Sequence, residues 1–350
     1  MKTKNIILLF SAAMVLISVT GCKKNDSGTS TEKQVAWVVG QADSAYSAGV
    51  ILYTEDGGDT WARQGDLQML KDIDILNIVS IDKDHLWAVG AMNTILKTED
   101  GGKNWVKVTT SPAPAYSNMM SVSATDKNHV AVSGAPGIVL VTSDGGGSWR
   151  MADTNLFRSG IVQGVCAITS DIIYAVGQYA TPTGTRGLVA MTRDGGNTWD
   201  TLVPPDDYNR YLWIGACATD TNHICIYGCV GHYMVTGDGY TTWMLGYLQS
   251  GDLNCMIMLD DHTYWAACDF DHILFSDNAG ISWTQQPSAG ISNQFLVGID
   301  AWSDRIALIT GQSAGAFPAG KILRTTDGGK TWNQIYTSNR NLFKVTFAKK

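Results

Sequence analysis

The chain has 350 residues, of which 45% are hydrophobic and 16% charged, with 37 Gly and 8 Pro. This composition excludes intrinsic disorder, collagen and coiled coil, and the net charge of -7 gives no electrostatic support to a nucleic-acid partner. Glutamate occurs only at Glu32, Glu55 and Glu99, which disfavours long helices because Glu is a better helix former than Asp. We therefore expect an all-β protein with many tight turns.

The N-terminal residues indicate a targeting signal. Two lysines precede an apolar run over residues 6–19, which has the length of a signal peptide. The sequence Val19-Thr20-Gly21-Cys22 resembles the lipobox of bacterial lipoproteins; the alternative is a chance cysteine after an ordinary secretion signal. The resemblance implies cleavage before Cys22, acylation of its sulfur, and a location outside the inner membrane, facing the periplasm or the cell surface, with the outer membrane favoured. Residues 22–34 are polar and predict a flexible tether.

An eight-residue pattern recurs seven times, first as TEDGGDTW at residues 54–61. The tryptophans that end the copies are 44, 44, 50, 44, 40 and 49 residues apart, a period typical of repeat architectures. The pattern resembles the Asp-box, or bacterial neuraminidase repeat. We predict that its third residue closes a tight turn by accepting backbone hydrogen bonds, rather than forming a metal or catalytic ring. These turn residues are Asp56, Asp100, Asp144, Asp194, Asp238, Asn278 and Asp327.

Each unit between two turns contains four expected strands. Around the second copy they cover residues 76–81, 85–90, 94–98 and 105–108. Four short strands in 40 to 50 residues are typical of a propeller blade. One slot in the second strand is aromatic in several units, which predicts packing between blades; it holds Trp37, Trp87, Tyr174 and Trp265.

The two ends of the repeat region complement each other. Residues 35–40 match a second strand with no first strand before it, whereas residues 341–347 match the first strands of the other units. We therefore predict a single seven-bladed β-propeller over residues 35–350, closed by its C-terminal strand, which removes free sheet edges.

The segment from Ala88 to Trp105 (AVGAMNTILKTEDGGKNW) resembles the repeat of the photosystem II stability/assembly factor family. Members of that family are seven-bladed, often lipid-anchored, extracytoplasmic propellers, so the resemblance implies this architecture and a binding role. In photosynthetic members an arginine-rich patch holds the assembly client. Here only Arg158, Arg186, Arg210 and Arg340 fall on the corresponding face, and nothing in the sequence indicates photosynthesis. We therefore carry over the architecture and a binding role, but not the client.

The strand order separates two faces of the propeller. The repeated turns join third and fourth strands and define what we call the turn face. The opposite face, here the loop face, carries the loops after each second strand and the connections into each first strand. Three of these loops are enlarged, at residues 41–48, 178–186 and 312–319, and each holds an aromatic among small hydroxyl residues, which suits surface recognition; the alternative is ordinary loop insertions.

The richest part of the loop face is expected between blades four and five. Arginines there would suit a carboxylate or phosphate, although scattered solvated arginines are the simpler interpretation. Together with the enlarged loops, this region supplies the candidate ligand-binding residues Tyr46, Arg158, Tyr179, Arg186, Tyr208, Arg210, Tyr211, Trp213 and Phe317.

Catalytic and metal chemistry has weak support in the sequence. A sialidase is disfavoured because no Glu follows Glu99, while a glycosidase that uses two aspartates remains the alternative function; its candidate pairs are Asp72 with Asp74 and Asp206 with Asp207. The histidines show no metal-ligand spacing, and no cofactor is expected. The later cysteines are expected to be mostly buried thiols whose spacing dictates no disulfide; they are Cys166, Cys217, Cys225, Cys229, Cys255 and Cys268. We thus expect a lipid-anchored, monomeric and non-enzymatic scaffold that binds a protein or a glycan on its loop face.

Overall fold

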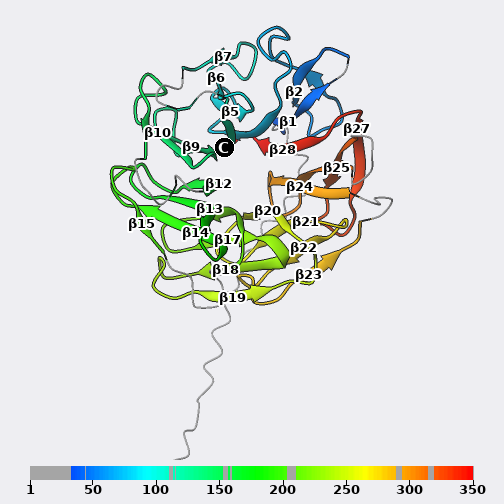
Figure 1. Ribbon diagram of the computed structural model, residues 1–350. Helices are drawn as coiled ribbons and strands as arrows, with labels where there is room; N and C mark the ends of the chain where they lie inside the picture. Colours follow the sequence, from blue (N-terminus) through cyan, green and yellow to red (C-terminus); the bar gives the residue numbers. More distant parts are fainter. Residues whose placement is uncertain are drawn as a thin grey trace, which may run out of the picture. The chain divides into compact units, whose positions relative to one another are not determined.

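The computed structural model describes residues 33–349 except 44, 110–112, 115, 153–156, 158–159, 203–209, 289–293 and 314–318. The described residues form twenty-eight strands in seven antiparallel four-stranded sheets. The sheets surround a central axis (Figure 1), within one compact unit over Gln34–Lys350. The prediction of a seven-bladed all-β propeller is therefore confirmed. Among the described residues, no helix has the length and apolar character needed to cross a membrane.

The first four blades each run from an inner strand to an outer strand. Blade one contains β28 (Leu342–Phe347), β1 (Ala36–Asp43), β2 (Ala48–Thr54) and β3 (Ala62–Arg63). Blade two contains β4 (Ile75–Ser80), β5 (Leu86–Gly90), β6 (Thr94–Thr98) and β7 (Val106–Lys107). Blade three contains β8 (Asn118–Ala124), β9 (Val130–Ala135), β10 (Ile138–Thr142) and β11 (Arg150–Met151). Blade four contains β12 (Gly160–Ala167), β13 (Ile173–Thr181), β14 (Gly184–Thr192) and β15 (Asp200–Thr201).

The remaining blades follow the same order. Blade five contains β16 (Trp213–Ala218), β17 (Ile224–Gly228), the short element η2 (Cys229–Gly231), β18 (His232–Thr236) and β19 (Met244–Tyr247). Blade six contains β20 (Leu253–Met258), β21 (Tyr264–Cys268), β22 (Ile273–Ser276) and β23 (Thr284–Gln286). Blade seven contains β24 (Gln294–Ala301), β25 (Ala307–Ser313), β26 (Gly320–Thr325) and β27 (Asn333–Ser338).

The C-terminal strand closes the ring, as the sequence predicts. In blade one β28 pairs antiparallel with β1, and Phe347 lies opposite Ala36. Figure 1 shows β28, in red, beside β1, in blue. Because residues from the two ends of the repeat region share one sheet, the propeller has no open junction between its first and last blades.

Apolar side chains fill the spaces between adjacent blades. The aromatic slot of the second strand is buried, and its rings meet the tryptophans that end the repeated turns of the next blade. Trp87 packs edge-on against Trp149 with 6.0 Å between ring centroids, and Trp265 packs in the same way against Trp332 at 6.1 Å. These contacts place the slot and the turn tryptophans in the inter-blade core.

The repeated turns share one hydrogen-bond pattern. In the third copy, Ser148 donates its backbone N–H to Asp144 Oδ1 at 2.9 Å and its hydroxyl to Oδ2 at 2.6 Å. The Thr142 hydroxyl donates to Asp144 Oδ1 at 2.8 Å and accepts the Gly146 N–H at 3.0 Å. In the sixth copy Asn278 Oδ1 accepts the equivalent bonds, from Ser276 and Ser282. The third residue of each turn thus satisfies donors that the turn would otherwise leave unpaired.

A contact passes from each blade to the repeated turn of the next. Most of these contacts are hydrogen bonds from a side chain to a backbone carbonyl of the neighbouring turn; between blades four and five an arginine instead lies over a tyrosine ring. The donor side chain and the accepting carbonyl oxygen of each hydrogen bond are Gln64 and Gly101, Lys97 and Gly145, Arg150 and Gly195, Tyr233 and Gly280, Gln286 and Gly328, and Arg324 and Gly57. The remaining contact is that of the Arg193 guanidinium over the Tyr240 ring. The turns therefore join adjacent blades as well as strands within a blade.

Candidate functional site

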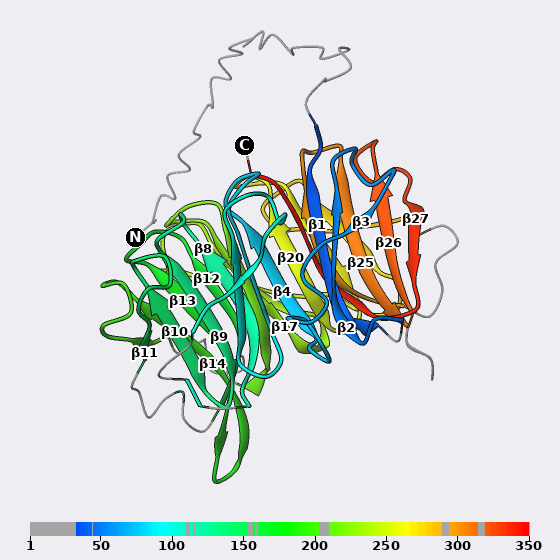
Figure 2. The same cartoon turned by 90° about the horizontal axis from the view of Figure 1, so that it is seen from above.

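The loop face carries a long hairpin in blade four. Strands β13 and β14 extend beyond the length of most other strands, and Figure 2 shows their hairpin projecting beyond the other loops. Two residues predicted for a binding site, Tyr179 and Arg186, lie directly opposite each other in this hairpin. Side chains opposite each other in an antiparallel pair lie on one face of the sheet, so the fold brings these two candidates together.

An aromatic stack lies beside the base of that hairpin. Tyr211 stacks on the His232 ring with 3.4 Å between centroids, and Tyr247 lies at 5.0 Å from the same ring. Arg210 precedes the stack and is exposed. Burial lowers the pKa of His232, so this ring is neutral at physiological pH and packs as an apolar ring against the two tyrosines.

The structure corrects the placement of one candidate in this region. Trp213 has no exposed surface and packs in the core between blades four and five. It supports the fold beneath the aromatic stack instead of presenting a binding surface. Arg158, Tyr208 and Phe317 lie outside the described residues.

Three turns on the loop face hold a large apolar residue in a left-handed backbone conformation. Met92, Val230 and Phe270 have φ values of 55°, 57° and 55°, and their exposed fractions are 54%, 57% and 65%. The following residue has a positive φ as well, which is the geometry of a type I′ turn and favours Asn, Asp or Gly at both positions. A β-branched or bulky residue with positive φ is a genuine outlier, so local turn preference does not explain these side chains.

Other exposed apolar side chains cluster on the same face. Tyr46, Leu67, Tyr116 and Tyr247 lie in its loops or at strand ends that reach it. Tyr46 is 57% exposed and lies under the Arg63 guanidinium, whose carbon is 5.1 Å from the ring centroid. The sequence interpretation identified Tyr46 but missed the turn residues. Their signal was available, because a large apolar residue occupies a turn position that normally selects Asn, Asp or Gly.

Acidic side chains flank the apolar turns of blades five and six. Asp252 accepts the Val230 N–H at 2.6 Å, and Asp269 accepts a bond from the Asn254 amide at 2.8 Å. Asp271 accepts the Gln294 N–H at 2.9 Å. These carboxylates hold the loops that present Val230 and Phe270, and they leave this sector negatively charged.

The aspartate pairs considered for glycosidase chemistry gain no support from their geometry. Asp74 Oδ1 accepts the Ala42 N–H at 2.8 Å, which gives it a loop-bonding role. Asp72 has a positive φ and donates its backbone N–H to Ser47 O at 2.7 Å. Asp206 and Asp207 lie outside the described residues.

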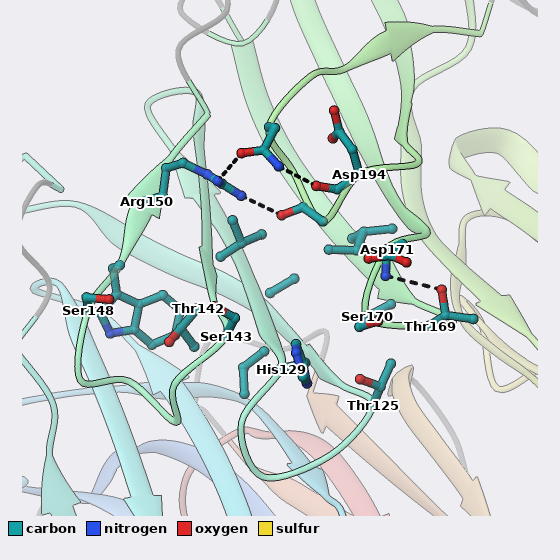
Figure 3. Close-up of a pocket in the computed structure, with 18 residues that line it drawn as sticks. Thr125, His129, Thr142, Ser143, Ser148, Arg150, Thr169, Ser170, Asp171 and Asp194 are labelled. Atoms are coloured by element: carbon teal, nitrogen blue, oxygen red, sulfur yellow. Dashed lines mark hydrogen bonds between the residues drawn. The ribbon is translucent and has the colours of Figure 1, made fainter.

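A groove of about 380 Å³ lies on the turn face between blades three and four. Figure 3 shows Arg150 crossing it to reach the turn that contains Asp194. The guanidinium donates to Gly195 O at 2.6 Å and also bonds the Asn197 side chain. Because Arg150 is occupied by inter-blade bonds, we interpret the groove as a seam between blades.

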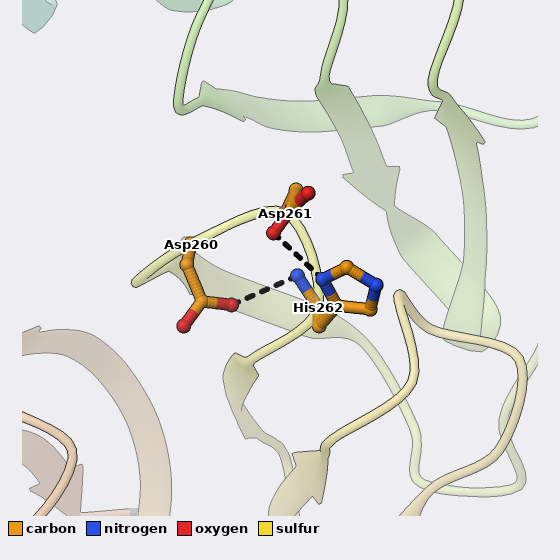
Figure 4. A group of neighbouring side chains, drawn as sticks. All are labelled: Asp260, Asp261 and His262. Atoms are coloured by element: carbon orange, nitrogen blue, oxygen red, sulfur yellow. Dashed lines mark hydrogen bonds and ion pairs between the residues drawn. The ribbon is translucent and has the colours of Figure 1, made fainter. Parts of the chain in front are cut away.

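Asp260, Asp261 and His262 form an exposed cluster whose donor atoms could approach a metal ion. Figure 4 shows that Asp260 accepts the His262 N–H, at 2.8 Å, while His262 Nδ1 pairs with Asp261. Turns between first and second strands in three other blades hold similar Asp and His pairs, missed in the sequence interpretation; they are Asp82–His85, Asp126–His129 and Asp220–His223. We therefore interpret the cluster as a turn whose Asp and His side chains stabilise the backbone, as in the other three blades.

The predicted thiols are free in the described part of the chain. Cys225, Cys255 and Cys268 are buried, and Cys166, Cys217 and Cys229 are half-buried. Burial raises the pKa of Cys166 to about 12, which keeps it protonated and unreactive at neutral pH.

Seven closed blades with a repeated turn and an apolar loop face define a β-propeller with a surface suited to recognition. The family model described as photosynthesis system II assembly factor YCF48 matches residues 26–155. The chain thus resembles the YCF48-like assembly factors, as the Ala88–Trp105 repeat indicates. No protein among the curated sequences matches it significantly.

Solved structures show the same fold over most of the chain. A structure described as YCF48 bound to D1 peptide is 24% identical, covers 75% of this chain and 80% of its own, and has a TM-score of 0.58. YCF48 from Cyanidioschyzon merolae is 18% identical, with coverages of 84% and 96% and a TM-score of 0.60. U3-55K, at 12% identity, has coverages of 76% and 84% and a TM-score of 0.56. At these identities the comparisons support the architecture.

Proposed function

We propose that the protein is a non-enzymatic scaffold that binds a protein client through its loop face. The observation that carries the proposal is the left-handed conformation of three exposed apolar residues, Met92, Val230 and Phe270. Backbone strain of this kind concentrates at functional sites. A left-handed L-residue costs roughly 1–2 kcal/mol, so a sequence shaped by turn stability alone would place Asn or Gly there.

The chemistry of the loop face favours a polypeptide over a glycan. Exposed apolar patches mark interaction sites, and large aromatic and apolar side chains carry much of the binding energy at protein interfaces. Arg186 adds donors for carboxylates beside the aromatic stack. The relative solved with a bound D1 peptide supports a polypeptide as the client.

Replacing Met92, Val230 and Phe270 together with Asn is expected to raise stability while it removes client binding. Asn tolerates the left-handed conformation, so relief of strain should stabilise the fold by up to about 1 kcal/mol per turn and raise the melting temperature. Loss of three exposed apolar side chains should weaken the client complex at least tenfold. The client would first be captured by a photo-crosslinking residue at position 270 in the intact cell envelope, then purified and titrated against each variant.

The matched control is Ile281, which is 71% exposed in a repeated turn on the turn face. A crosslinker at position 281 should not capture the client, and Ile281→Asn should leave its affinity unchanged. Full client affinity in the triple Asn variant would exclude the turns as the binding surface. Capture of a glycan at position 270 would redirect the proposal to carbohydrate binding.

We also propose that the scaffold is held at a membrane by a lipid on Cys22, outside the inner membrane. The motif Val19-Thr20-Gly21-Cys22 after an apolar run supports this. Cys22→Ser is expected to move the protein from the membrane fraction to the soluble fraction, because it removes the residue that carries the lipid. Mass spectrometry of the wild-type N-terminus checks the result; a soluble wild-type protein without lipid would contradict it.

A further inference from the structure

A lysine from the closing strand contacts a thiol near the centre of the ring. Lys344 Nζ, from β28 in blade one, lies 3.0 Å from Cys255 Sγ, from β20 in blade six. Blade seven lies between them, and its inner strand approaches β28 closely at Gly298, where a Cβ would lie 3.0 Å from Lys344 Cα. The contact therefore spans an entire blade and joins residues 89 positions apart in the sequence.

Both residues line a central cavity of about 510 Å³ formed by the innermost strands. A cavity of this volume exceeds the space that a few water molecules need, so it has room for a small solute beside the pair. Cys255 is 2% exposed, which shields it from larger reagents.

The Lys344 amino group lies beside the Cys255 sulfur, and Asp300 acts on the same lysine. Cysteine reacts as the thiolate, and a neighbouring ammonium group favours that form. Burial opposes the charge of Lys344, but Cys255 and Asp300 raise its pKa above the ordinary value. Asp300 lies on β24 and accepts the Phe347 N–H at 2.8 Å and the Ala301 N–H at 2.9 Å, and burial raises its pKa.

Two other titratable groups near the pair have raised pKa values. The Cys225 thiol and burial raise the pKa of Cys217 well above its ordinary value. Burial also raises the pKa of Tyr227, whose hydroxyl lies near Cys255. Of the cavity thiols in the described residues, Cys255 is the one in contact with a lysine Nζ.

We propose that Cys255 and Lys344 form a site of oxidative cross-linking, in which hydrogen peroxide converts the contact into a sulfur–nitrogen bond. The bond ties β20 of blade six to the strand that closes the ring. A cross-link between residues 89 positions apart restricts the unfolded chain strongly, so oxidation stabilises the folded propeller. This inference is independent of the client proposed above.

The chemistry balances with hydrogen peroxide as the oxidant. The Cys255 thiolate attacks one peroxide oxygen; the S–O bond forms, the O–O bond breaks, and the leaving hydroxide takes a proton from the Lys344 ammonium to become water. Sulfur loses two electrons, which reduce the peroxide. The neutral Lys344 amine then attacks the sulfenic acid, a known electrophile for nitrogen; the S–N bond forms, and the S–O bond breaks with release of a second water. The chain loses two hydrogen atoms in total.

The test is peptide mapping by mass spectrometry of the full chain after treatment with hydrogen peroxide. We expect the peptides that contain Cys255 and Lys344 to be joined, with loss of two hydrogen atoms, and to separate again on thiol treatment. The melting temperature should rise by several degrees on oxidation. Both effects should disappear in Cys255→Ser and in Lys344→Met.

Cys217→Ser is the matched control, because it removes a neighbouring cavity thiol and should leave the cross-link intact. Circular dichroism of each reduced variant checks that the propeller is folded. A Cys255 that reaches sulfinic or sulfonic acid without any link to Lys344 would overturn the proposal. A disulfide between Cys255 and Cys217 in the wild type, with Lys344 unmodified, would overturn it as well.

Discussion

A chain that ends at residue 340 is expected not to fold to a soluble monomer. The deletion removes β28, the inner strand of blade one, together with its pairing to β1. Without β28, the edge of β1 that paired with it is exposed at the ring junction, and exposed edges promote aggregation. The prediction is checked by size-exclusion chromatography and thermal unfolding of the truncated and full chains.

The size of the expected effect follows from burial. Leu342 and Val345 have no exposed surface, and Phe347 is nearly as buried. Loss of one large buried side chain costs roughly 2–5 kcal/mol, and three such losses approach the whole net stability of a folded protein, about 5–15 kcal/mol. The loss of one strand in twenty-eight is therefore sufficient to unfold the ring.

The matched control removes Lys349 and Lys350 alone. That variant keeps β28 and the hydrogen bond from Ala348 N to Val35 O, so it should melt with the full chain. If the variant ending at residue 340 were monomeric and melted within a few degrees of the full chain, β28 would not hold the ring closed.

The propeller could be predicted from the sequence because its signals are local and repeated. The turns combine an Asp and a Trp at fixed spacing, with Asn278 in place of the Asp in the sixth turn, and the second strand of several units has an aromatic slot. Seven copies of the turn give seven blades, and the C-terminal strand supplies the inner strand that blade one lacks, so the ring is expected to close. The fourth strands are shorter than predicted in blade two, where β7 covers Val106–Lys107, because the outer strand pairs on one side only and the chain turns away after two residues.

The binding surface was harder to predict, because it depends on which loops become neighbours. Tyr179 and Arg186 were identified individually, and the hairpin register that sets them opposite each other follows from strand length. Phe270 and Val230 lie in turns with a left-handed backbone, a conformation that their residue types do not predict. The contact of Lys344 with Cys255 crosses an intervening blade, and sequence spacing gives no measure of such a distance.

The protein is expected to lose stability steadily as the pH falls from about 5 to about 2. Hydrogen bonds from Thr198 lower the pKa of Asp194 to about 2, and those from Thr331 lower the pKa of Asp327 to about 2. Burial raises the pKa of Asp56, but bonds from Thr60 and Thr54 bring it to about 2. Unfolded aspartate has a pKa of about 3.9, so the unfolded chain binds more protons in this interval.

The sign of the effect follows from that difference in proton binding. A carboxyl group with a lowered folded-state pKa stabilises the fold fully above its unfolded pKa, and the contribution is lost as the pH falls through the folded value. The effect is cumulative because other aspartates have lowered pKa values too. In the repeated turns these are Asp100, Asp144 and Asp238. In the turns between first and second strands they are Asp82, Asp126, Asp220 and Asp260. Melting temperatures measured between pH 7 and pH 2 should therefore fall progressively below pH 5.

Two substitutions at one turn separate charge from hydrogen bonding. Asp144→Ala removes the acceptors for Ser148 and Thr142, so it should lower the melting temperature at pH 7 and leave client binding intact in the folded fraction. Asp144→Asn should melt near the wild type at pH 7, because Asn278 already serves the sixth turn. Since neither variant has a carboxyl group at position 144, both should depend less steeply on pH below 5. A wild-type melting temperature that stays constant down to pH 3 would show that the repeated turns do not couple protonation to folding. A loss of client affinity in Asp144→Ala at unchanged melting temperature would place the client on the turn face.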